Sequence, residues 1–239
     1  MFGAFLMQNE TDSQFFDVHL PKKTAVLVDL SFFLKVRYSK LQDYPQPAEL
    51  AEEIRKYVLK TLGTSKDYLF RVFVYDCEPV SGRTQQPISK KQLSLDQDDV
   101  AQYRTELLKM LKQKPYFSVR LGRLHLDKRN KWVLNPEVLK KLLSGKKSVK
   151  DLKDEDFQLN LRQKMVDMKI GLDIASLAIK KQAEKVVLIT NDSDFVPAIK
   201  FAKQEGMIVQ LDPLRQDVAE DLSPHIDLLR SVSTQDQGQ

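Results

Sequence analysis

Three aspartates in this chain follow runs of apolar residues that are typical of strands inside a parallel sheet. Asp29 ends the run TAVLVD, and Asp192 and Asp194 come directly after the run KVVLIT. Because the carboxyl ends of parallel strands meet at one edge of a sheet, we expect these carboxylates to converge. Mg²⁺ and Mn²⁺ prefer carboxylate and water oxygens, and a phosphodiester can supply further ligands. The pattern predicts a metal-dependent nuclease-type site.

A fourth carboxylate is expected from the segment 161–183, whose apolar residues have helical spacing. At about 100° per residue, Asp167 lies on a small, apolar stripe that includes Ile174. Asp173 lies on a polar stripe with Lys169, and these two residues have the i,i+4 spacing of an ion pair. We therefore expect Asp167 in the metal site and Asp173 in an outer or ion-paired role.

Each acid also has an ordinary structural explanation. Ser193 or Asp194 could cap a helix that begins near Phe195, because short polar side chains accept hydrogen bonds from the first backbone N–H groups of a helix. Asp29 is harder to explain in this way. Burying a carboxylate at a strand end is costly unless it is paired, metal-bound or satisfied by a loop amide. The convergence of several acids favours the metal site.

Several polar residues near these acids are candidate substrate contacts. Lys164 lies three residues before Asp167 and could bind a phosphate, although a solvated surface lysine is the commoner case. Ser193, between two aspartates, is a second candidate. Ser31 has no evident histidine partner that would make it a nucleophile, so we assign it to a turn or to the outer shell of the site. The three histidines are scattered without the spacing of a zinc site.

Positive charge is concentrated in the middle of the chain. Residues 101–131 contain nine basic residues against two acidic ones, whereas the whole chain has a formal net charge of +5. A surplus of five positive charges alone is common among soluble proteins. The prediction of a nucleic-acid partner therefore rests on the clustering of the basic residues in this segment. We expect this segment to face phosphates, with Arg120 and Arg123 as candidate contacts to RNA.

The elements that must position these residues alternate between strands and helices. We predict strands at 24–30, 68–75, 117–126, 185–190 and 207–211, and helices at 47–62, 98–112, 161–183 and about 195–203, with a shorter helix from 136. Strands that are apolar on both sides are typical of sheets covered on both faces. The predicted fold class is α/β, with a doubly wound, mainly parallel sheet and helices on both faces.

Length and composition are consistent with one soluble domain. We predict a single domain at 21–231 with a basic and charged insertion around 80–160, an extension at 1–20 and a flexible tail at 232–239. A hydrophobic content of 42% excludes a wholly disordered chain. The only cysteine, Cys77, excludes an intramolecular disulfide framework. Without a secretory signal or an apolar run of about 18 residues, we expect a cytoplasmic protein with no membrane span.

Three segments together form a familiar pattern: VLVD at 26–29, QKMVDMKIGLDIASLAIKKQ at 163–182 and VVLITNDSDFVPAIKFAKQEG at 186–206. They resemble the LabA-like NYN domain family of the PIN-like and FLAP-nuclease-like folds, and the likeness spans most of the chain. The resemblance implies a metal-dependent ribonuclease-type site. By position, Asp29 matches the aspartate of the first strand, Lys164–Asp167 the motif Lys-Gly-Val-Asp, and Thr190–Phe195 the motif Ser-Gly-Asp-Ser-Asp-Phe. Asp173 matches a second acid that is often present in the helix.

The carboxylates of the family pattern are kept, whereas small residues around them are replaced. Leu30 and Met165 stand where the family has glycine, Phe32 stands where asparagine is frequent, and Asn191 replaces a further glycine. Because glycine permits close backbone approach and unusual dihedrals, we expect Leu30, Phe32 and Met165 to add bulk beside the site. Access for substrate is then narrower, and activity is weakened, altered or lost.

The leading prediction is a Mg²⁺- or Mn²⁺-dependent ribonuclease in which four aspartates hold the ion and basic residues position RNA, with DNA as the other candidate polymer. Those aspartates are Asp29, Asp167, Asp192 and Asp194. The alternative is an NYN-fold module that binds nucleic acid or a protein partner without efficient catalysis. A phosphohydrolase or receiver-type domain is a weaker third reading, since the acid expected two residues after Asp29 is absent. The sequence leaves the RNA target, the number of ions and homo-oligomer formation open.

Overall fold

A seven-stranded sheet runs through the molecule in the computed structural model, which describes residues 21–38, 41–63, 67–127 and 129–232. Its strand order is β11-β10-β9-β1-β2-β5-β8, and every neighbouring pair is parallel except β5 and β8. The strands are β1 (Lys23–Asp29), β2 (Tyr68–Glu78), β5 (Phe117–Leu126), β8 (Leu161–Lys164), β9 (Lys185–Ile189), β10 (Ile208–Asp212) and β11 (Leu228–Leu229). The predicted α/β class with a mainly parallel sheet is confirmed.

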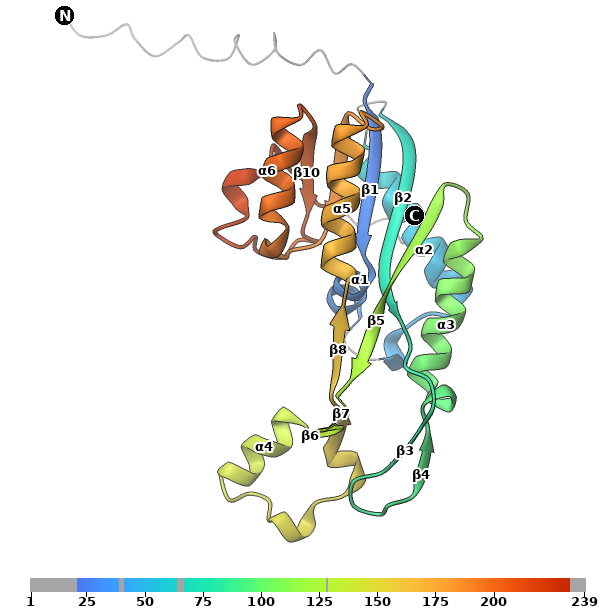
Figure 1. The fold of residues 1–239 in the computed structure, drawn as a ribbon, viewed down its shortest axis with the longest axis vertical. Coiled ribbons are helices and arrows are strands. Elements are labelled where there is room, and N and C mark those ends of the chain that lie inside the picture. Colours follow the sequence, from blue (N-terminus) through green and yellow to red (C-terminus); the bar gives the residue numbers. More distant parts are fainter. Residues whose placement is uncertain (1–20, 39–40, 64–66, 128, 233–239) are drawn as a thin grey trace, which may run out of the picture.

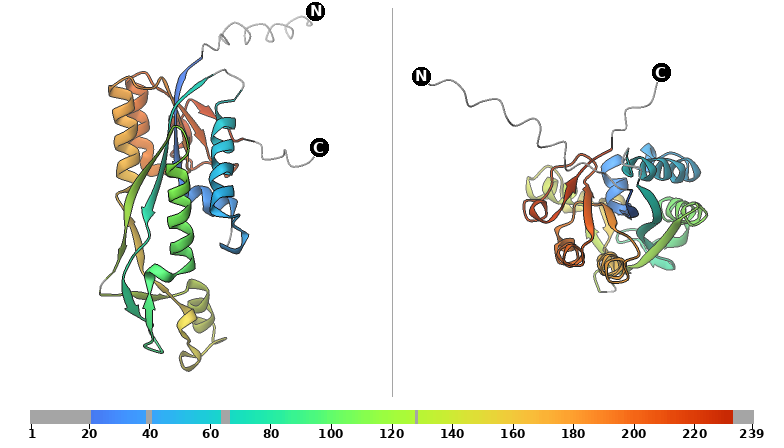
Figure 2. Two further views of the ribbon diagram at one scale, coloured as in Figure 1. Left: turned by 90° about the vertical axis from the view of Figure 1, so that its right-hand side faces the viewer. Right: turned by 90° about the horizontal axis from the view of Figure 1, so that it is seen from above.

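Helices cover both faces of this sheet (Figures 1 and 2). One layer contains α1 (Leu30–Arg37), α2 (Pro47–Thr61) and α3 (Asp99–Lys112), and the other contains α5 (Val166–Ile179) and α6 (Val196–Gln204). Successive residues of β1 alternate between the two cores, because side chains alternate across a strand. Ala25 and Leu27 pack on the α5–α6 side, whereas Val26 and Val28 pack on the α1–α3 side. This double burial explains the continuous apolar run.

The prediction of a helix over 161–183 is wrong at its beginning. Residues Leu161–Lys164 are strand β8, which pairs antiparallel with β5, and α5 begins only at Val166. All four residues of β8 are exposed, so its sequence has no periodicity that separates a strand from a helix. Gly122 of β5 permits the close pairing, since a Cβ there would lie 2.6 Å from the carbonyl oxygen of Lys164.

Met165 joins β8 to α5 in a left-handed backbone conformation, with φ of 74°. This conformation costs a non-glycine residue roughly 1–2 kcal/mol, and the side chain is 50% exposed, so its removal forfeits little packing. The greater freedom of glycine in the unfolded chain offsets part of the gain. We expect Met165→Gly to raise the free energy of unfolding in urea by about 0.5–1 kcal/mol.

Leu172→Gly is the matched control for this prediction. Leu172 lies in the middle of α5 and is 63% exposed. Glycine there should lower the free energy of unfolding by about 1 kcal/mol, because it is a poor helix former. Loss of stability in both variants would contradict the proposed strain at Met165.

An arm extends from the carboxyl edge of the sheet (Figure 1), and we define it as residues 79–97 and 129–160. It contains the hairpin β3 (Arg83–Gln85) and β4 (Gln92–Ser94), together with β6 (Trp132–Leu134), α4 (Pro136–Leu143) and β7 (Phe157–Leu159). The arm falls within the predicted insertion around 80–160, and the division into domains stays a prediction. The predicted extension at 1–20 and all of the predicted tail at 232–239 except its first residue lie outside the described residues.

Candidate acidic site

The acidic site lies at the carboxyl ends of β1 and β9, beside the neighbouring strand β2. Asp29 is the last residue of β1, and Asp192 and Asp194 follow β9, which pairs with β1. The structure adds Asp76, which the sequence analysis missed. Asp29 pairs with Tyr75 of β2, so Asp76 lies one residue further along the neighbouring strand. Its position after an apolar strand is the same signal that identified Asp29.

Asp29 is half-buried and also caps helix α1. The backbone N–H of Phe32 donates to its Oδ1 at 3.1 Å. Burial raises the pKa of Asp29 to about 6; the backbone of Phe32 opposes this rise, and the negative charges of Asp76 and Asp167 add to it. The cap satisfies one carboxylate oxygen, and the electrostatic coupling indicates that the acids lie close enough to repel one another.

Asp167 lies in the first turn of α5 and faces the acids that follow β9. Burial raises its pKa, and the charges of Asp192 and Asp194 raise it further. Asp192 accepts a hydrogen bond from the backbone N–H of Asp194 at 2.9 Å and caps the short 3₁₀ turn Ser193–Phe195. The alternative explanation, in which Ser193 or Asp194 is the cap, is therefore wrong, because the turn begins two residues earlier than the predicted helix.

Asp76 is 4% exposed and is held by two partners. Arg104 of α3 donates from Nη1 at 2.8 Å, and Ser31 donates from Oγ at 3.3 Å. Burial raises the pKa of Asp76, and the positive charge of Arg104 opposes the rise. Gln163 of β8 donates from Nε2 to Ser31 Oγ at 2.8 Å. Ser31, assigned to an outer position, thus links β8 to the acidic edge.

Asp173 lies apart from these acids in a separate network. Arg120 Nε donates to it at 3.2 Å, and the hydroxyl of Tyr75 donates at 2.8 Å. The predicted ion pair with Lys169 is wrong, because the partner comes from the sheet beneath the helix. The guanidinium of Arg120 also lies over the ring of Phe73, 5.2 Å from its centroid. With these partners, a contact between Arg120 and RNA stays a prediction.

Lys164 and Arg123 are exposed and directly opposite each other in the β5–β8 pair. Opposed residues of an antiparallel pair project from the same face, so the two cations lie side by side and form a small positively charged patch. Lys164 lies three residues before Asp167, next to the acidic site. Their predicted role in binding substrate is compatible with this geometry and stays a prediction.

A cavity of about 480 Å³ opens at the acidic edge. Its lining comprises Asp29, Ser31, Phe32, Lys35, Thr190, Asn191, Asp192 and Ser193. Thr190 Oγ1 and Asn191 Oδ1 are buried there without a hydrogen-bond partner in the described part of the chain. Buried polar atoms rarely remain unpaired, so these two oxygens are available to a ligand.

The lining of the cavity shows that the expected crowding by Leu30 is wrong, and it includes Lys35, which was not predicted as a site residue. Leu30 was expected to crowd the site, but its side chain is fully buried in the α1–α3 core and is not among the residues that line the cavity. Phe32 does line it, in the place where the resembling family has asparagine. Lys35, one helical turn after Ser31, adds a cation that the sequence analysis missed because α1 was not predicted.

The residues present fit a hard divalent cation held by few direct ligands. The cavity offers carboxylate, hydroxyl and amide oxygens, which are the donors that Mg²⁺ prefers. Within the described ranges, no three His, Cys, Asp or Glu side chains are grouped closely enough to hold one ion. The binding of one ion by all four aspartates stays a prediction. One or two carboxylates suffice for Mg²⁺, which keeps several waters.

A curled, mainly parallel sheet with acidic residues at its carboxyl edge is consistent with the PIN-like class of folds. Residues 107–222 match the NYN domain family model, and NYN domains belong to the PIN-like superfamily. The matched range includes Asp167, Asp192 and Asp194 and begins after Asp29 and Asp76. An NYN domain indicates a nuclease-like function related to RNA.

Two other comparisons add little to this assignment. No curated protein matches the chain. A crystal structure of a protein of unknown function from Vibrio parahaemolyticus is similar at a TM-score of 0.47 and 13% sequence identity, over 90% of this chain and 94% of that chain. None of the described helices combines the length and apolar character needed to cross a membrane.

Proposed function

We propose that this protein is a Mg²⁺- or Mn²⁺-dependent ribonuclease of the LabA-like NYN type that cleaves RNA at the acidic edge. One observation carries the proposal: the cavity lined by Asp29 and Asp192 is also lined by Thr190 and Asn191, whose side-chain oxygens are buried and have no hydrogen-bond partner in the described residues. Oxygen donors beside coupled carboxylates are suited to a divalent cation and a phosphodiester. A cytoplasmic location fits such a role and is part of the proposal.

A bound divalent ion would supply charge neutralisation at the scissile phosphate and a more acidic water. Asp29 and Asp192, which line one cavity from β1 and from the turn after β9, are the first candidates to hold it. Asp167 adds negative charge at the same opening. Lys35, in the cavity lining, and Lys164, beside Asp167, would bind non-bridging phosphate oxygens as point charges.

A second candidate function is RNA binding without efficient cleavage. Phe32 favours it, because its ring lines the cavity where the resembling family has an amide that could orient a water or a phosphate. Among the described residues, no three His, Cys, Asp or Glu side chains are grouped so that they could hold a metal ion, and this also favours binding without efficient cleavage. This function would be marked by salt-dependent binding to RNA without turnover.

Asp192→Asn tests the ribonuclease proposal directly. Asparagine can still accept the hydrogen bond that caps the 3₁₀ turn, so the fold is kept while the charge is removed. We expect cleavage of single-stranded and structured RNA to require added Mg²⁺ or Mn²⁺ and to fall at least about 100-fold in the variant. Gel assays over time, with and without EDTA, measure both effects.

Asp221→Asn is the control, since it removes the same charge from an exposed residue outside the cavity lining. It should cleave at the rate of the natural protein. Cleavage that persists in EDTA, or an Asp192→Asn variant with full activity, would overturn the ribonuclease assignment. Binding of RNA with no cleavage in any metal would favour the second candidate.

A further inference from the structure

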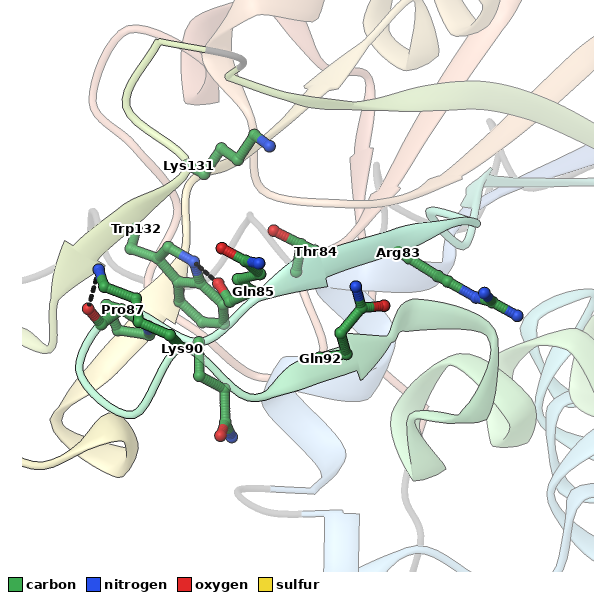
Figure 3. A pocket seen from close by; sticks show the side chains of 9 residues that line it. Arg83, Thr84, Gln85, Pro87, Lys90, Gln92, Lys131 and Trp132 are labelled. Atoms are coloured by element: carbon green, nitrogen blue, oxygen red, sulfur yellow. Dashed lines mark hydrogen bonds between the residues drawn. The ribbon is translucent and has the colours of Figure 1, made fainter.

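A second hollow, of about 360 Å³, lies in the arm between the β3–β4 hairpin and the beginning of β6 (Figure 3). Three cations line it: Arg83, Lys90 and Lys131. Trp132 forms part of the wall, half-buried, with its ring beside the hairpin. Among the described residues that line the hollow there is no carboxylate. The hollow is therefore positive and carries an aromatic ring.

Hydrogen bonds between the two parts of the arm hold this hollow in shape. The indole Nε1 of Trp132 donates to the backbone oxygen of Gln85 at 2.9 Å. Asp154 accepts from the backbone N–H groups of Ile88 and Ser89 at 2.8 and 3.2 Å, at the tip of the hairpin. These bonds link 79–97 to 129–160 and fix the indole relative to the hairpin.

One polar atom in the hollow lacks a protein partner. Thr84 is 6% exposed, lines the hollow, and its Oγ1 makes no hydrogen bond to the described residues. A hydroxyl can both donate and accept, so it suits the edge of a nucleobase. Lys90 donates to the backbone oxygen of Pro87 at 2.7 Å, which leaves Arg83 and Lys131 as the cations for phosphate.

A row of three cations and one histidine leads from the acidic site towards this hollow. In the β5–β8 pair, Lys164 lies opposite Arg123, and Arg162 lies opposite His125. Side chains two residues apart on a strand share a face, so all four project from one side of the ribbon. Trp132 pairs with Leu159, five residues before Lys164, which is at most roughly 17 Å of chain.

We propose that the arm hollow binds one nucleotide of single-stranded RNA, with the base stacked on Trp132 and the phosphates bound by Arg83 and Lys131. Stacking on an aromatic ring requires an unpaired base, which excludes an intact duplex as the ligand. The row of cations would carry the strand from the hollow to the acidic edge. This inference rests on the proposed action on RNA and names the form of RNA that is bound.

The fluorescence of Trp132 provides the test, because it is the only tryptophan of the chain. Titration with a 12-nucleotide oligouridylate at low salt should quench this fluorescence to saturation, whereas a 12-base-pair RNA duplex or polyglutamate should not. The double variant Arg83→Gln and Lys131→Gln should weaken binding about tenfold. Lys146→Gln, an exposed lysine of the arm outside the hollow, should leave the affinity unchanged.

Fluorescence anisotropy of a labelled oligouridylate measures binding in variants that lack Trp132. It distinguishes a loss of base stacking from a loss of the hydrogen bond that holds the two parts of the arm together. Trp132→Ala should weaken binding about tenfold, and Trp132→Phe, which loses the bond to Gln85 but keeps an aromatic face, should retain most of it. Absence of quenching, equal quenching by the duplex or by polyglutamate, or an equal effect of Lys146→Gln would overturn the inference.

Asp192→Asn distinguishes failure of this inference from failure of the proposed function. The variant should show the same quenching as the natural protein, since Asp192 lines a different cavity. Quenching by oligouridylate without metal-dependent cleavage would contradict the ribonuclease and leave the RNA site intact. Metal-dependent cleavage without quenching would contradict the arm site alone.

Discussion

Replacing Arg104 by methionine should lower the free energy of unfolding by about 3 kcal/mol at pH 8. Arg104 is the cationic partner of Asp76, whose side chain is 4% exposed, and the two are joined at 2.8 Å. Removing one member of a buried ion pair leaves an uncompensated charge, which is far more costly than losing an exposed pair. Urea unfolding followed by circular dichroism measures the effect.

The loss should be smaller at pH 5, and Asp76→Asn should reverse much of it. Burial already raises the pKa of Asp76, and without Arg104 the pKa rises further, so falling pH protonates the carboxyl and removes the penalty. In the Asp76→Asn background, Arg104→Met should cost much less. Arg55→Met, which breaks a half-exposed pair with Glu52, should have little effect. Equal losses at Arg104 and Arg55 would refute a buried charge at Asp76.

The sequence predicted the sheet well because each central strand is buried on both faces. β1 and β9 consist mostly of continuous apolar runs and β2 contains the buried run VFVY, and this pattern has few alternative explanations. β8 was missed because four exposed residues become a strand only by pairing with β5, which local sequence does not report. Helix α1 was missed although Asp29 and the spacing of Leu30, Phe33 and Leu34 are typical of a capped helix.

The site was predicted in part, and the omissions have a common cause. Strand-end position identified Asp29 and Asp192, and the same signal was present at Asp76, which directly follows the predicted strand that ends at Tyr75. Hydrogen-bond and ion-pair partners that come from another strand of the sheet could not be predicted from the sequence. Asp173 binds Arg120 instead of Lys169, because a residue of the underlying strand competes with the neighbour on the helix. Thr190 Oγ1 is unpartnered in the described residues only as a result of packing, so no motif reports it.

The burial of Asp29, together with the carboxylates around it, costs stability when no cation is bound. Asp29 has a pKa of about 6 in the folded protein, against 3.8 for an unperturbed side chain. A raised pKa in an acid means that folding opposes ionisation. The penalty to the free energy of folding is absent below pH 3.8, the pKa of Asp29 in the unfolded chain. It grows as the pH rises from 3.8 to about 6, the pKa in the folded protein, and is complete above that range. A stability cost at a functional edge is the usual balance between activity and stability.

Asp29→Asn should therefore raise the free energy of unfolding by about 2 kcal/mol at pH 8 in EDTA. Asparagine can keep the cap on Phe32 while removing the charge that burial, Asp76 and Asp167 disfavour. At pH 4 the difference should largely vanish, because Asp29 is then mostly protonated in the folded protein. Urea unfolding at both pH values gives the two differences.

The exposed cap Asp98 is the matched control, since its side chain accepts from Ala101 in the same way at 3.2 Å. Asp98→Asn should change stability little at either pH. Mg²⁺ should narrow the gap between Asp29→Asn and the natural protein, because an ion that binds only the folded state stabilises the form that retains its ligand. A destabilised Asp29→Asn variant at pH 8 would mean that the carboxylate is a structural cap rather than part of a cation site.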